Sequence, residues 1–410
     1  MNSSPTSFPR EKVSILLLEG IHQSAIENFD RAGYSVINRS GALSEEDLLE
    51  LIPNVHILGI RSKTQITPRV VEASQHLLAI GCFCIGTNQV ALEAAARNGT
   101  PVFNAPFSNT RSVAELTIAE VVMLSRRAAH KSQLMHQGIW DKSATGSYEV
   151  RGKTIGIVGY GNIGPQVGIL AEALGMHVLY FDIKKVLPLG NAQPVSSLEE
   201  LLKRSDFVTL HVPETPQTKS MIGAAEIGKM KKGSILLNLS RGTVVDLSAL
   251  QHALSNEHLA GAAIDVFPEE PMTNAEEFVS ELRGIPNVIL TPHVGGSTLE
   301  AQRSIGVEVS DSLIGFLETG ASVGAVNFPV VELPVLEDSH RVLNIHRNIP
   351  GALSEINRVI AETGANISAQ YLSTHSEIGY LIMDVGPKLS REVKQHLDKL
   401  PANIRTRLLF

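Results

Sequence analysis

The sequence is poor in cysteine. Cys82 and Cys84 are the only two cysteines among 410 residues, which is too few for a disulfide framework. Residues i and i+2 of a strand share a face but are poorly placed to bridge each other. We therefore expect two small thiols in a buried strand, in a reducing, cytoplasmic compartment. A metal site would need further ligands near these thiols, and none is evident, so no metal is predicted.

The chain also lacks an excess of positive charge and a long apolar run. Its net charge of −7 and its isoelectric point near 6.1 argue against a nucleic-acid surface. No run reaches the roughly 18 apolar residues of a membrane span. Residues 1–10 are polar, without the apolar centre of a signal sequence, and are expected to form a flexible tail. The length suits two or three globular domains.

The most informative segment is Lys153–Gly164, which reads KTIGIVGYGNIG. An apolar strand leads into Gly-x-Gly-x-x-Gly, and a helical pattern follows. Gly159 suits a tight turn, Gly161 allows close approach of a pyrophosphate, and Gly164 allows helix and strand to pack closely. The start of the helix offers free backbone amides to phosphates. This arrangement predicts a dinucleotide site.

The next strand ends at Asp182, near the spacing expected for a carboxylate that accepts both ribose hydroxyls. Such a carboxylate repels a 2′-phosphate, so the predicted cofactor is NAD rather than NADP. Lys184 and Lys185 weaken that preference.

The pattern of apolar segments divides the chain into three blocks. Strands and helices alternate in residues 11–107, the predicted substrate-binding domain. Residues 108–298 open with a helix over Val113–Ala129 and then hold the glycine motif and four later strands, as in a nucleotide-binding domain. A helix near 299–318 could return the chain to the first block, so we assign 299–332 to that domain. We predict two Rossmann-like, doubly wound parallel sheets, the substrate-binding domain being discontinuous.

The third block, residues 333–410, has the order β-α-β-β-α-β of a ferredoxin-like module. It is small and carries no catalytic constellation, so binding or assembly is its expected task.

Three residues follow strand ends of the second block: Arg241, Glu270 and His293. Histidine suits a base that takes a hydroxyl proton, a carboxylate can orient it, and arginine can hold a substrate carboxylate bidentately. From position alone, Arg241 could equally cap a helix and Glu270 could open a proline-bounded turn. The sequence holds 14 histidines.

Several motifs resemble those of D-isomer-specific 2-hydroxyacid dehydrogenases: GYGNIG, SRGTVVD, AIDVFPEEP, TPHVGGST, IGCFCIGTN and NAPFSNTRSVAE. With its C-terminal module, the chain is similar to the bacterial branch of that family that carries an ACT domain. The resemblance covers nearly the whole chain after the first ten residues. It implies that Arg241, Glu270 and His293 are catalytic, Glu270 being preferred over Glu269 because it directly precedes the proline.

The resemblance also implies which residues contact NAD beyond the three motif glycines. These residues are Asn162, Ile163, Asp182, Leu239, Ser240, Arg241, Asp265, His293, Val294, Gly295 and Gly296.

In that branch the reaction is the oxidation of 3-phosphoglycerate to 3-phosphohydroxypyruvate, the first step of phosphorylated L-serine synthesis. A side reduction of 2-oxoglutarate is also known there. A phosphorylated acid needs extra cations: Arg61, Ser62 and Asn109 match substrate-contacting positions. Lys142 could reach in from a neighbouring chain of a homotetramer, although Lys142 and Lys63 also fit solvated surface cations.

The C-terminal module resembles an ACT domain, which binds amino acids between two copies. His346, Asn348 and Asn366 match serine-binding positions, which implies feedback inhibition by L-serine. Relatives can carry a Gly-Gly hinge before this domain, whereas residues 334–339 contain none, and a stiffer linker could weaken the coupling.

Two alternatives stay open at this point. One is another D-2-hydroxyacid dehydrogenase, such as a glyoxylate or hydroxypyruvate reductase, although these often lack an ACT module. The other is a non-enzymatic NAD-sensing co-repressor built on the same fold.

Overall fold

The structure is a computed structural model that describes residues 8–271, 275–336 and 338–410. The chain divides into two compact units, one of Met1–Ser108 with Gln302–Phe410 and one of Asn109–Ala301. Most of the predicted tail, residues 1–7, lies outside the described residues, and a short 3-10 helix, η1 (Arg10–Lys12), follows it. Among the described helices, none is long and apolar enough to cross a membrane.

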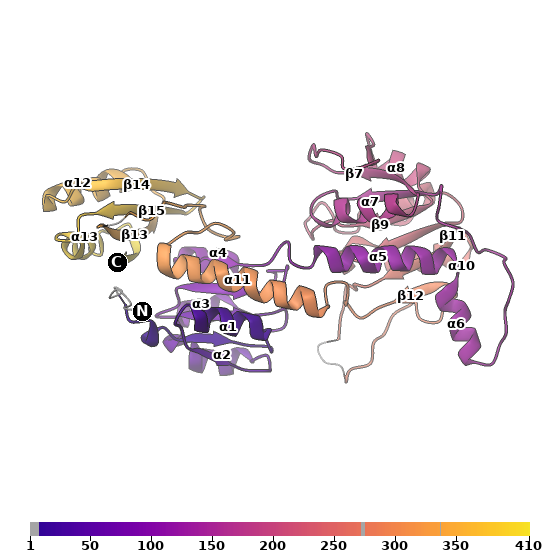
Figure 1. Cartoon of the computed structure of the whole chain (residues 1–410), viewed down its shortest axis with the longest axis horizontal. Helices are drawn as coiled ribbons and strands as arrows, with labels where there is room; N and C mark the ends of the chain where they lie inside the picture. Colours follow the sequence, from indigo (N-terminus) through magenta and orange to yellow (C-terminus); the bar gives the residue numbers. More distant parts are fainter. Residues whose placement is uncertain (1–7, 272–274, 337) are drawn as a thin grey trace. The chain divides into compact units, whose positions relative to one another are not determined.

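The first unit, in which Figure 1 labels the helices α1, α2, α3, α4 and α11, contains a parallel sheet with the strand order β2-β1-β3-β4-β5. Helices α1 and α11 cover one face, and α2, α3 and α4 cover the other. Both faces are therefore buried, which explains why strands such as ILL and AIGC are apolar throughout. The strands are β1 (Ile15–Leu17), β2 (Val36–Asn38), β3 (Ile57–Ile60), β4 (Ala79–Cys82) and β5 (Val102–Phe103). The helices are α1 (Gln23–Arg31), α2 (Glu45–Leu51), η2 (Ile52–Asn54), α3 (Pro68–Ala73), α4 (Leu92–Arg97) and α11 (Leu299–Thr319).

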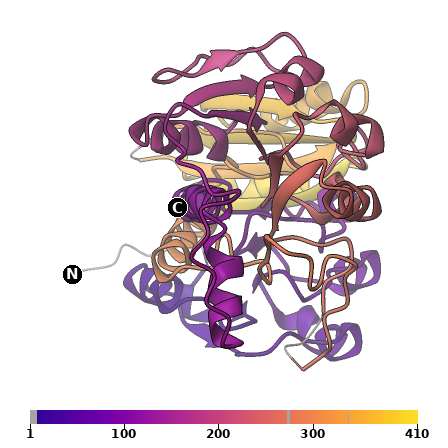
Figure 2. The same ribbon diagram turned by 90° about the vertical axis from the view of Figure 1, so that its right-hand side faces the viewer.

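The second unit is built on a seven-stranded parallel sheet of order β12-β11-β10-β9-β6-β7-β8, flanked by helices (Figure 2). Helices α5 and α7 pack on one face, and α8, α9 and α10 on the other. The strands are β6 (Thr154–Val158), β7 (His177–Phe181), β8 (Gln193–Pro194), β9 (Phe207–Leu210), β10 (Ser234–Asn238), β11 (Leu259–Ile264) and β12 (Val288–Leu290). The helices are α5 (Thr110–Ser125), α6 (Ala128–His136), α7 (Ile163–Ala173), α8 (Leu198–Arg204), α9 (Ala224–Lys229), η3 (Gly242–Val244) and α10 (Leu247–Ser255). The strand order reverses beside β6, where doubly wound sheets bind their ligands.

Two local predictions were wrong. The single helix expected over Val113–Ala129 is broken, because α5 ends at Ser125 and Arg127 adopts a left-handed conformation with φ 54°. The apolar face of α5 is buried as far as Leu124, whereas α6 buries no residue, so packing stops where the helix breaks. Cys82 lies in a buried strand as expected, but half-buried Cys84 lies beyond the end of β4.

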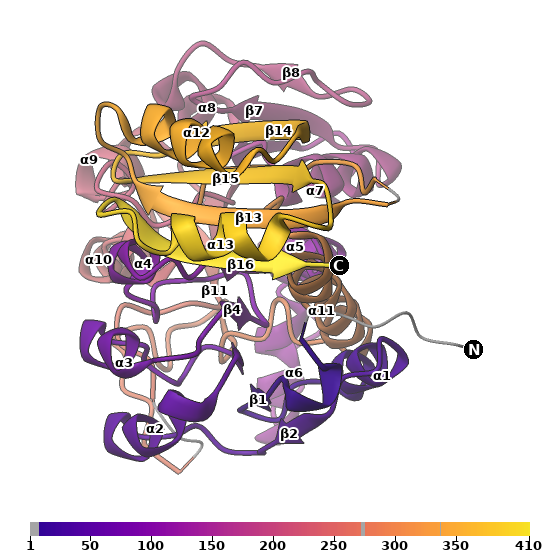
Figure 3. The ribbon, with the colours of Figure 1, turned by 90° about the vertical axis from the view of Figure 1, so that its left-hand side faces the viewer.

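The C-terminal module is an antiparallel sheet of order β14-β15-β13-β16 with α12 and α13 on one face (Figure 3). The predicted β-α-β-β-α-β order is confirmed. The opposite face of the sheet, with Leu343, Ile345 and Tyr380, joins the hydrophobic core of the first sheet and α11. The elements are β13 (His340–Arg347), α12 (Ala352–Thr363), β14 (Ile367–Thr374), β15 (Ile378–Val385), α13 (Ser390–Leu397) and β16 (Asn403–Leu409).

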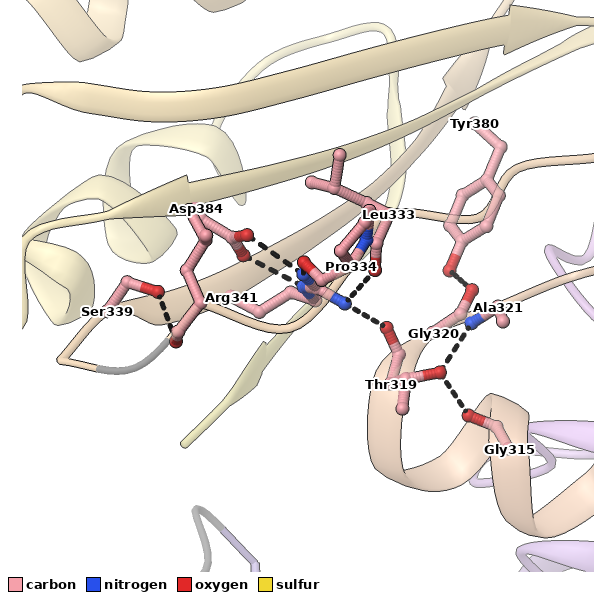
Figure 4. A network of polar contacts seen from close by, with 11 residues as sticks. Gly315, Thr319, Gly320, Ala321, Leu333, Pro334, Ser339, Arg341, Tyr380 and Asp384 are labelled. Atoms are coloured by element: carbon pink, nitrogen blue, oxygen red, sulfur yellow. Dashed lines mark hydrogen bonds and ion pairs between the residues drawn. The ribbon is translucent and has the colours of Figure 1, made fainter.

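A buried arginine ties the linker to this module (Figure 4). Arg341 forms an ion pair with Asp384, with two hydrogen bonds of 2.8 Å. Its remaining N–H groups donate to the carbonyls of Thr319, Leu333 and Pro334. One guanidinium therefore holds the carbonyl of Pro334, the first residue of the segment without a Gly-Gly pair, and the carbonyl of Leu333 just before it.

Candidate active site

The three candidate catalytic residues follow three neighbouring strands of the second unit. Arg241 comes after β10, Glu270 after β11 and His293 after β12. Because the strands are parallel, their carboxyl ends meet at one edge of the sheet. The loops after them are therefore brought together there.

His293 and Glu270 are in direct contact. The Nδ1 atom of the imidazole lies 2.9 Å from Oε2 and 3.1 Å from Oε1 of the carboxylate. The backbone N–H of Phe267 donates to Oε1 and limits the rotation of the carboxylate. With Nδ1 engaged by a carboxylate, the tautomer that carries its hydrogen on Nδ1 is favoured, and Nε2 is left free to accept a proton.

The two partners shift each other's protonation. The hydrogen bond to Glu270 raises the pKa of His293 above its usual value, against the opposing effect of burial. Burial acts to raise the pKa of Glu270, but the hydrogen bond and charge of His293 outweigh it, so that this pKa lies below its usual value. The pair thus combines an ionised carboxylate with a histidine of increased basicity.

Asp265 holds the histidine loop in place. Its carboxylate accepts hydrogen bonds from the Thr291 hydroxyl at 2.6 Å and from the backbone N–H groups of Val294 and Gly295, both at 2.8 Å. The backbone N–H of His293 donates to the carbonyl of Asp265 at 2.8 Å. His293 itself adopts a left-handed φ of 55°, which a non-glycine residue keeps only where its surroundings enforce it. Asp265, predicted as a cofactor contact, therefore also positions the candidate base, His293.

Arg241 occupies the third loop of the same edge. The Asn238 side chain donates to its carbonyl at 3.0 Å, and its own Nη1 donates to the carbonyl of Ser240 at 2.7 Å. Its charge is close enough to affect the pKa of both His293 and Glu270. Gly242 is packed so closely that a Cβ there would lie 2.0 Å from the carbonyl carbon of Phe267. The SRG motif thus needs glycine in order to bring the arginine loop against the glutamate loop.

The glycine motif has the shape of a phosphate cradle. Gly159 has φ 90°, and a Cβ on it would lie 2.4 Å from the His211 carbonyl oxygen. A Cβ on Gly164 would lie 2.4 Å from the carbonyl oxygen of Gly159. By contrast, a Cβ on Gly161 would meet nothing within 4 Å, so this residue faces open space. No side chain caps the start of α7 at Asn162, which leaves the backbone amides there available to an anion.

Asp182 connects the end of β7 to this cradle. One oxygen of its carboxylate accepts from the backbone N–H of Tyr160 at 2.7 Å, and the other from that of Lys184 at 2.8 Å. Each oxygen keeps a lone pair for a ribose hydroxyl. Lys184 and Lys185 are exposed. The open side of Gly161, the uncapped helix and this carboxylate together fit NAD.

Asn109 lies directly against the histidine loop. A Cβ on Gly296 would lie 2.3 Å from Nδ2 of Asn109, so a side chain at position 296 would displace the Asn109 amide. The Oδ1 atom of Asn109 is buried without a partner among the described residues. A buried acceptor of this kind is suited to a ligand donor.

The first unit holds the remaining substrate candidates in one loop, after β3. The carboxylate of Glu19 accepts backbone hydrogen bonds from Arg61 at 3.2 Å, Lys63 at 3.0 Å and Thr64 at 2.9 Å. Arg61 is half-buried, whereas Ser62 and Lys63 are exposed. Sequence reasoning missed Glu19, although an acidic residue directly after β1, beside β3, was a usable signal.

The other predicted residues belong to other segments of the chain. Lys142 is exposed in the segment after α6, beside Trp140, which is 76% exposed. In the C-terminal module Asn348 and Asn366 are exposed, but His346 is buried, with Nδ1 2.9 Å from Oδ1 of Asn344. The Asn348 side chain donates to the carbonyl of His375.

Known proteins resemble this chain over its whole length. A model described as "D-isomer specific 2-hydroxyacid dehydrogenase, NAD binding domain" matches residues 118–295, and one described as "AHAS small subunit-like ACT domain" matches residues 343–405. The chain is 53% identical to a D-3-phosphoglycerate dehydrogenase of Dictyostelium discoideum, over 99% of both chains. It is also 53% identical to the protein of that name from Escherichia coli K12, over 98% of this chain and 99% of the other. A crystal structure of a protein from Thermus thermophilus superposes with a TM-score of 0.67 at 31% identity, over 74% of this chain and 97% of that one.

Proposed function

Because this chain belongs to the family of D-isomer-specific 2-hydroxyacid dehydrogenases, we propose that it oxidises 3-phospho-D-glycerate to 3-phosphohydroxypyruvate, the first step of L-serine synthesis. The observation that carries this reaction is the contact of His293 with Glu270 at the edge of an NAD-binding sheet. The relatives from Dictyostelium discoideum and Escherichia coli K12, each 53% identical to this chain, are D-3-phosphoglycerate dehydrogenases.

In this proposal the three catalytic residues have separate tasks. One group takes the hydroxyl proton of the substrate, one orients that group, and one binds the substrate carboxylate. NAD, when bound, accepts the hydride that leaves C2 of the substrate. His293 takes the hydroxyl proton on Nε2, and Glu270 orients the ring through Nδ1 and stabilises the imidazolium that forms. Arg241 binds the substrate carboxylate, for which its planar pair of N–H donors is suited. Gly161, the start of α7 and Asp182 would hold the cofactor.

The Glu270→Gln variant should change the pH dependence of the oxidation. Oxidation needs a neutral His293, so its rate falls as pH drops through the pKa of that residue. Since Glu270 raises this pKa, its neutral replacement lowers it and moves the acid limb of the kcat profile to lower pH. We expect kcat on the plateau to fall about 10-fold or more, because the ring loses its orienting carboxylate. Kinetics between pH 5 and 9 will test this, and an acid limb that stays in place contradicts it. Glu269→Gln, the neighbouring glutamate, serves as the control.

We further propose that L-serine inhibits the enzyme at the C-terminal module. Asn348 and Asn366 are exposed there and can bind a carboxylate and an ammonium group between two copies of the chain. The test is NADH oxidation with phosphohydroxypyruvate, with and without serine. We expect turnover, serine inhibition and loss of that inhibition in Asn348→Ala, with basal kcat retained. Asn54→Ala, an exposed asparagine of the first unit, should keep the inhibition.

The outcomes of this assay separate the two proposals. Absence of turnover by folded protein on phosphohydroxypyruvate overturns the catalytic proposal. Turnover on that substrate that is insensitive to millimolar serine overturns only the regulatory one.

A homotetramer is the assembly we propose. Ile139, Trp140 and Tyr148 are large apolar side chains exposed in one segment of the second unit, next to Lys142. Such a group of side chains favours burial against another chain. A chain with only two cysteines suits a reducing compartment, and we propose that the enzyme lies in the cytoplasm.

A further inference from the structure

A cavity of about 980 Å³ lies within the first unit, at the seam between the first sheet and the C-terminal module. His56 and His76 belong to one wall, and Arg391 of α13 and Arg405 of β16 to the other. Neither the catalytic residues nor His346, Asn348 or Asn366 line it. The catalytic and serine proposals therefore leave this cavity without a role.

The cavity has an excess of positive charge. Six arginine and lysine side chains line it, against two side-chain carboxylates. Both carboxylates are already paired: Glu318 accepts from Arg10 at 2.7 Å, and Asp384 binds Arg341 through two hydrogen bonds. Of the remaining cations, Lys394 forms an ion pair with Asp398, so the excess of positive charge rests on the other arginines.

Three arginines of the cavity, Arg391, Arg405 and Arg407, form no ion pair with a carboxylate within the described part of the chain. Arg407 donates to two carbonyls in the last turn of α11, where the free carbonyls of the helix end favour a cation. Among the described residues, Arg405 donates a hydrogen bond only to the carbonyl of Leu77, and Arg391 lies over the ring of Phe410. Burial and the charge of Arg407 lower the pKa of Arg405 to about 10, so it remains a cation at neutral pH.

A charge that is removed from water without an opposite charge beside it is costly. An anion that enters the cavity would relieve this cost for Arg405. Guanidinium groups bind carboxylates and phosphates bidentately. The rest of the lining is largely apolar, with Val13, Leu408 and Phe410 as examples. The volume lies at the upper end of small-molecule sites and far exceeds that of a lone phosphate.

We propose that this cavity binds a small organic anion with more than one negative charge. Its phosphate or carboxylate groups pair with Arg391 and Arg405, and its carbon body packs against the apolar wall. Because the walls come from the first sheet and from the C-terminal module, such a ligand bridges the two and stabilises their contact.

The test is isothermal titration of the full-length, NAD-saturated protein with citrate and with pyrophosphate, at constant ionic strength. We expect saturable binding of at least one probe, citrate reporting on carboxylate recognition and pyrophosphate on phosphate recognition. Arg391→Gln and Arg405→Gln should each weaken it at least about tenfold, the effect of one lost charged hydrogen bond or more. Arg358→Gln, on the exposed face of α12, is the matched control and should bind as the unchanged protein does.

Arg241→Gln separates this cavity from the catalytic site, whose arginine also attracts carboxylates. Binding that survives Arg241→Gln and is lost in Arg391→Gln supports the proposal. Three results would overturn it. The first is that Arg241→Gln abolishes binding, and the second is that Arg358→Gln weakens binding as much as Arg391→Gln does. The third is that neither probe shows saturable binding. Should Arg405→Gln fail to fold, because its guanidinium also bonds the Leu77 carbonyl, Arg391→Gln and Lys394→Gln on α13 decide the question.

Discussion

Replacement of His293 by asparagine is expected to lower kcat for 3-phosphoglycerate oxidation by about 10²- to 10⁴-fold, the usual contribution of a positioned general base. Asparagine has a similar size and can still donate to Glu270, but it cannot accept the proton that leaves with the hydride. The pH dependence that comes from the raised pKa of His293 should disappear with it. Steady-state kinetics from pH 5 to 9 measure both effects.

NAD affinity offers an internal check on this variant. The cradle at Gly161 and Asp182 is formed by other loops, so the dissociation constant for NADH should stay within a few-fold. His252→Asn, which changes an exposed histidine of α10, is the matched control and should keep full activity. A kcat of His293→Asn within twofold of the unchanged enzyme would show that another group takes the proton.

Arg241→Gln is the second change with a large expected effect, in kcat/KM. Two charged hydrogen bonds to the substrate carboxylate are lost, each worth about 1.5–3 kcal/mol, which corresponds to a decrease on the order of 10²- to 10⁴-fold. Arg241→Lys keeps the charge but not the planar pair of donors, so its activity should lie between the two. The measurement is kcat and KM for 3-phosphoglycerate at saturating NAD.

The proposed role of Arg241 differs from that of a general positive charge near the site. Arg204→Gln, which removes an exposed arginine paired with Glu200 on α8, should leave kcat/KM unchanged. A KM for 3-phosphoglycerate that Arg241→Gln does not raise would indicate that the substrate carboxylate binds elsewhere.

The fold was largely predictable because both parallel sheets are buried on both faces. Strands such as SILLN in β10 are buried throughout and mainly apolar, and helical patterns separate them, so the order of elements can be read directly. The failures were local. The break between α5 and α6 depends on where packing ends, and neighbouring polar residues such as Arg126 and Arg127 do not mark it in the sequence.

The sequence motifs identified the residues of the candidate active site but not the contacts between them. The sequence placed Glu270 and His293 after different strands, 23 positions apart, and the sheet brings them to 2.9 Å. The sequence did not predict that the carboxylate of Asp265 would hold the histidine loop, or that the carboxylate of Glu19 would hold the Arg61 loop, by hydrogen bonds. Both act through backbone amides, whose positions no side-chain pattern records.

By itself, the sequence determined the class of this protein: glycines where a phosphate must approach, a carboxylate at the next strand end, and three chemically suited residues after parallel strands. These features are local or repeat with the period of a helix or strand, so they can be read without coordinates. Only the tertiary structure decided which side chains meet. In the folded chain His293 contacts Glu270, and the side chain of His346 is buried inside the C-terminal module. Arg391 and Arg405 line the same cavity. Such contacts join residues that are distant in the sequence, and they arise only when sheets and helices pack their buried faces together.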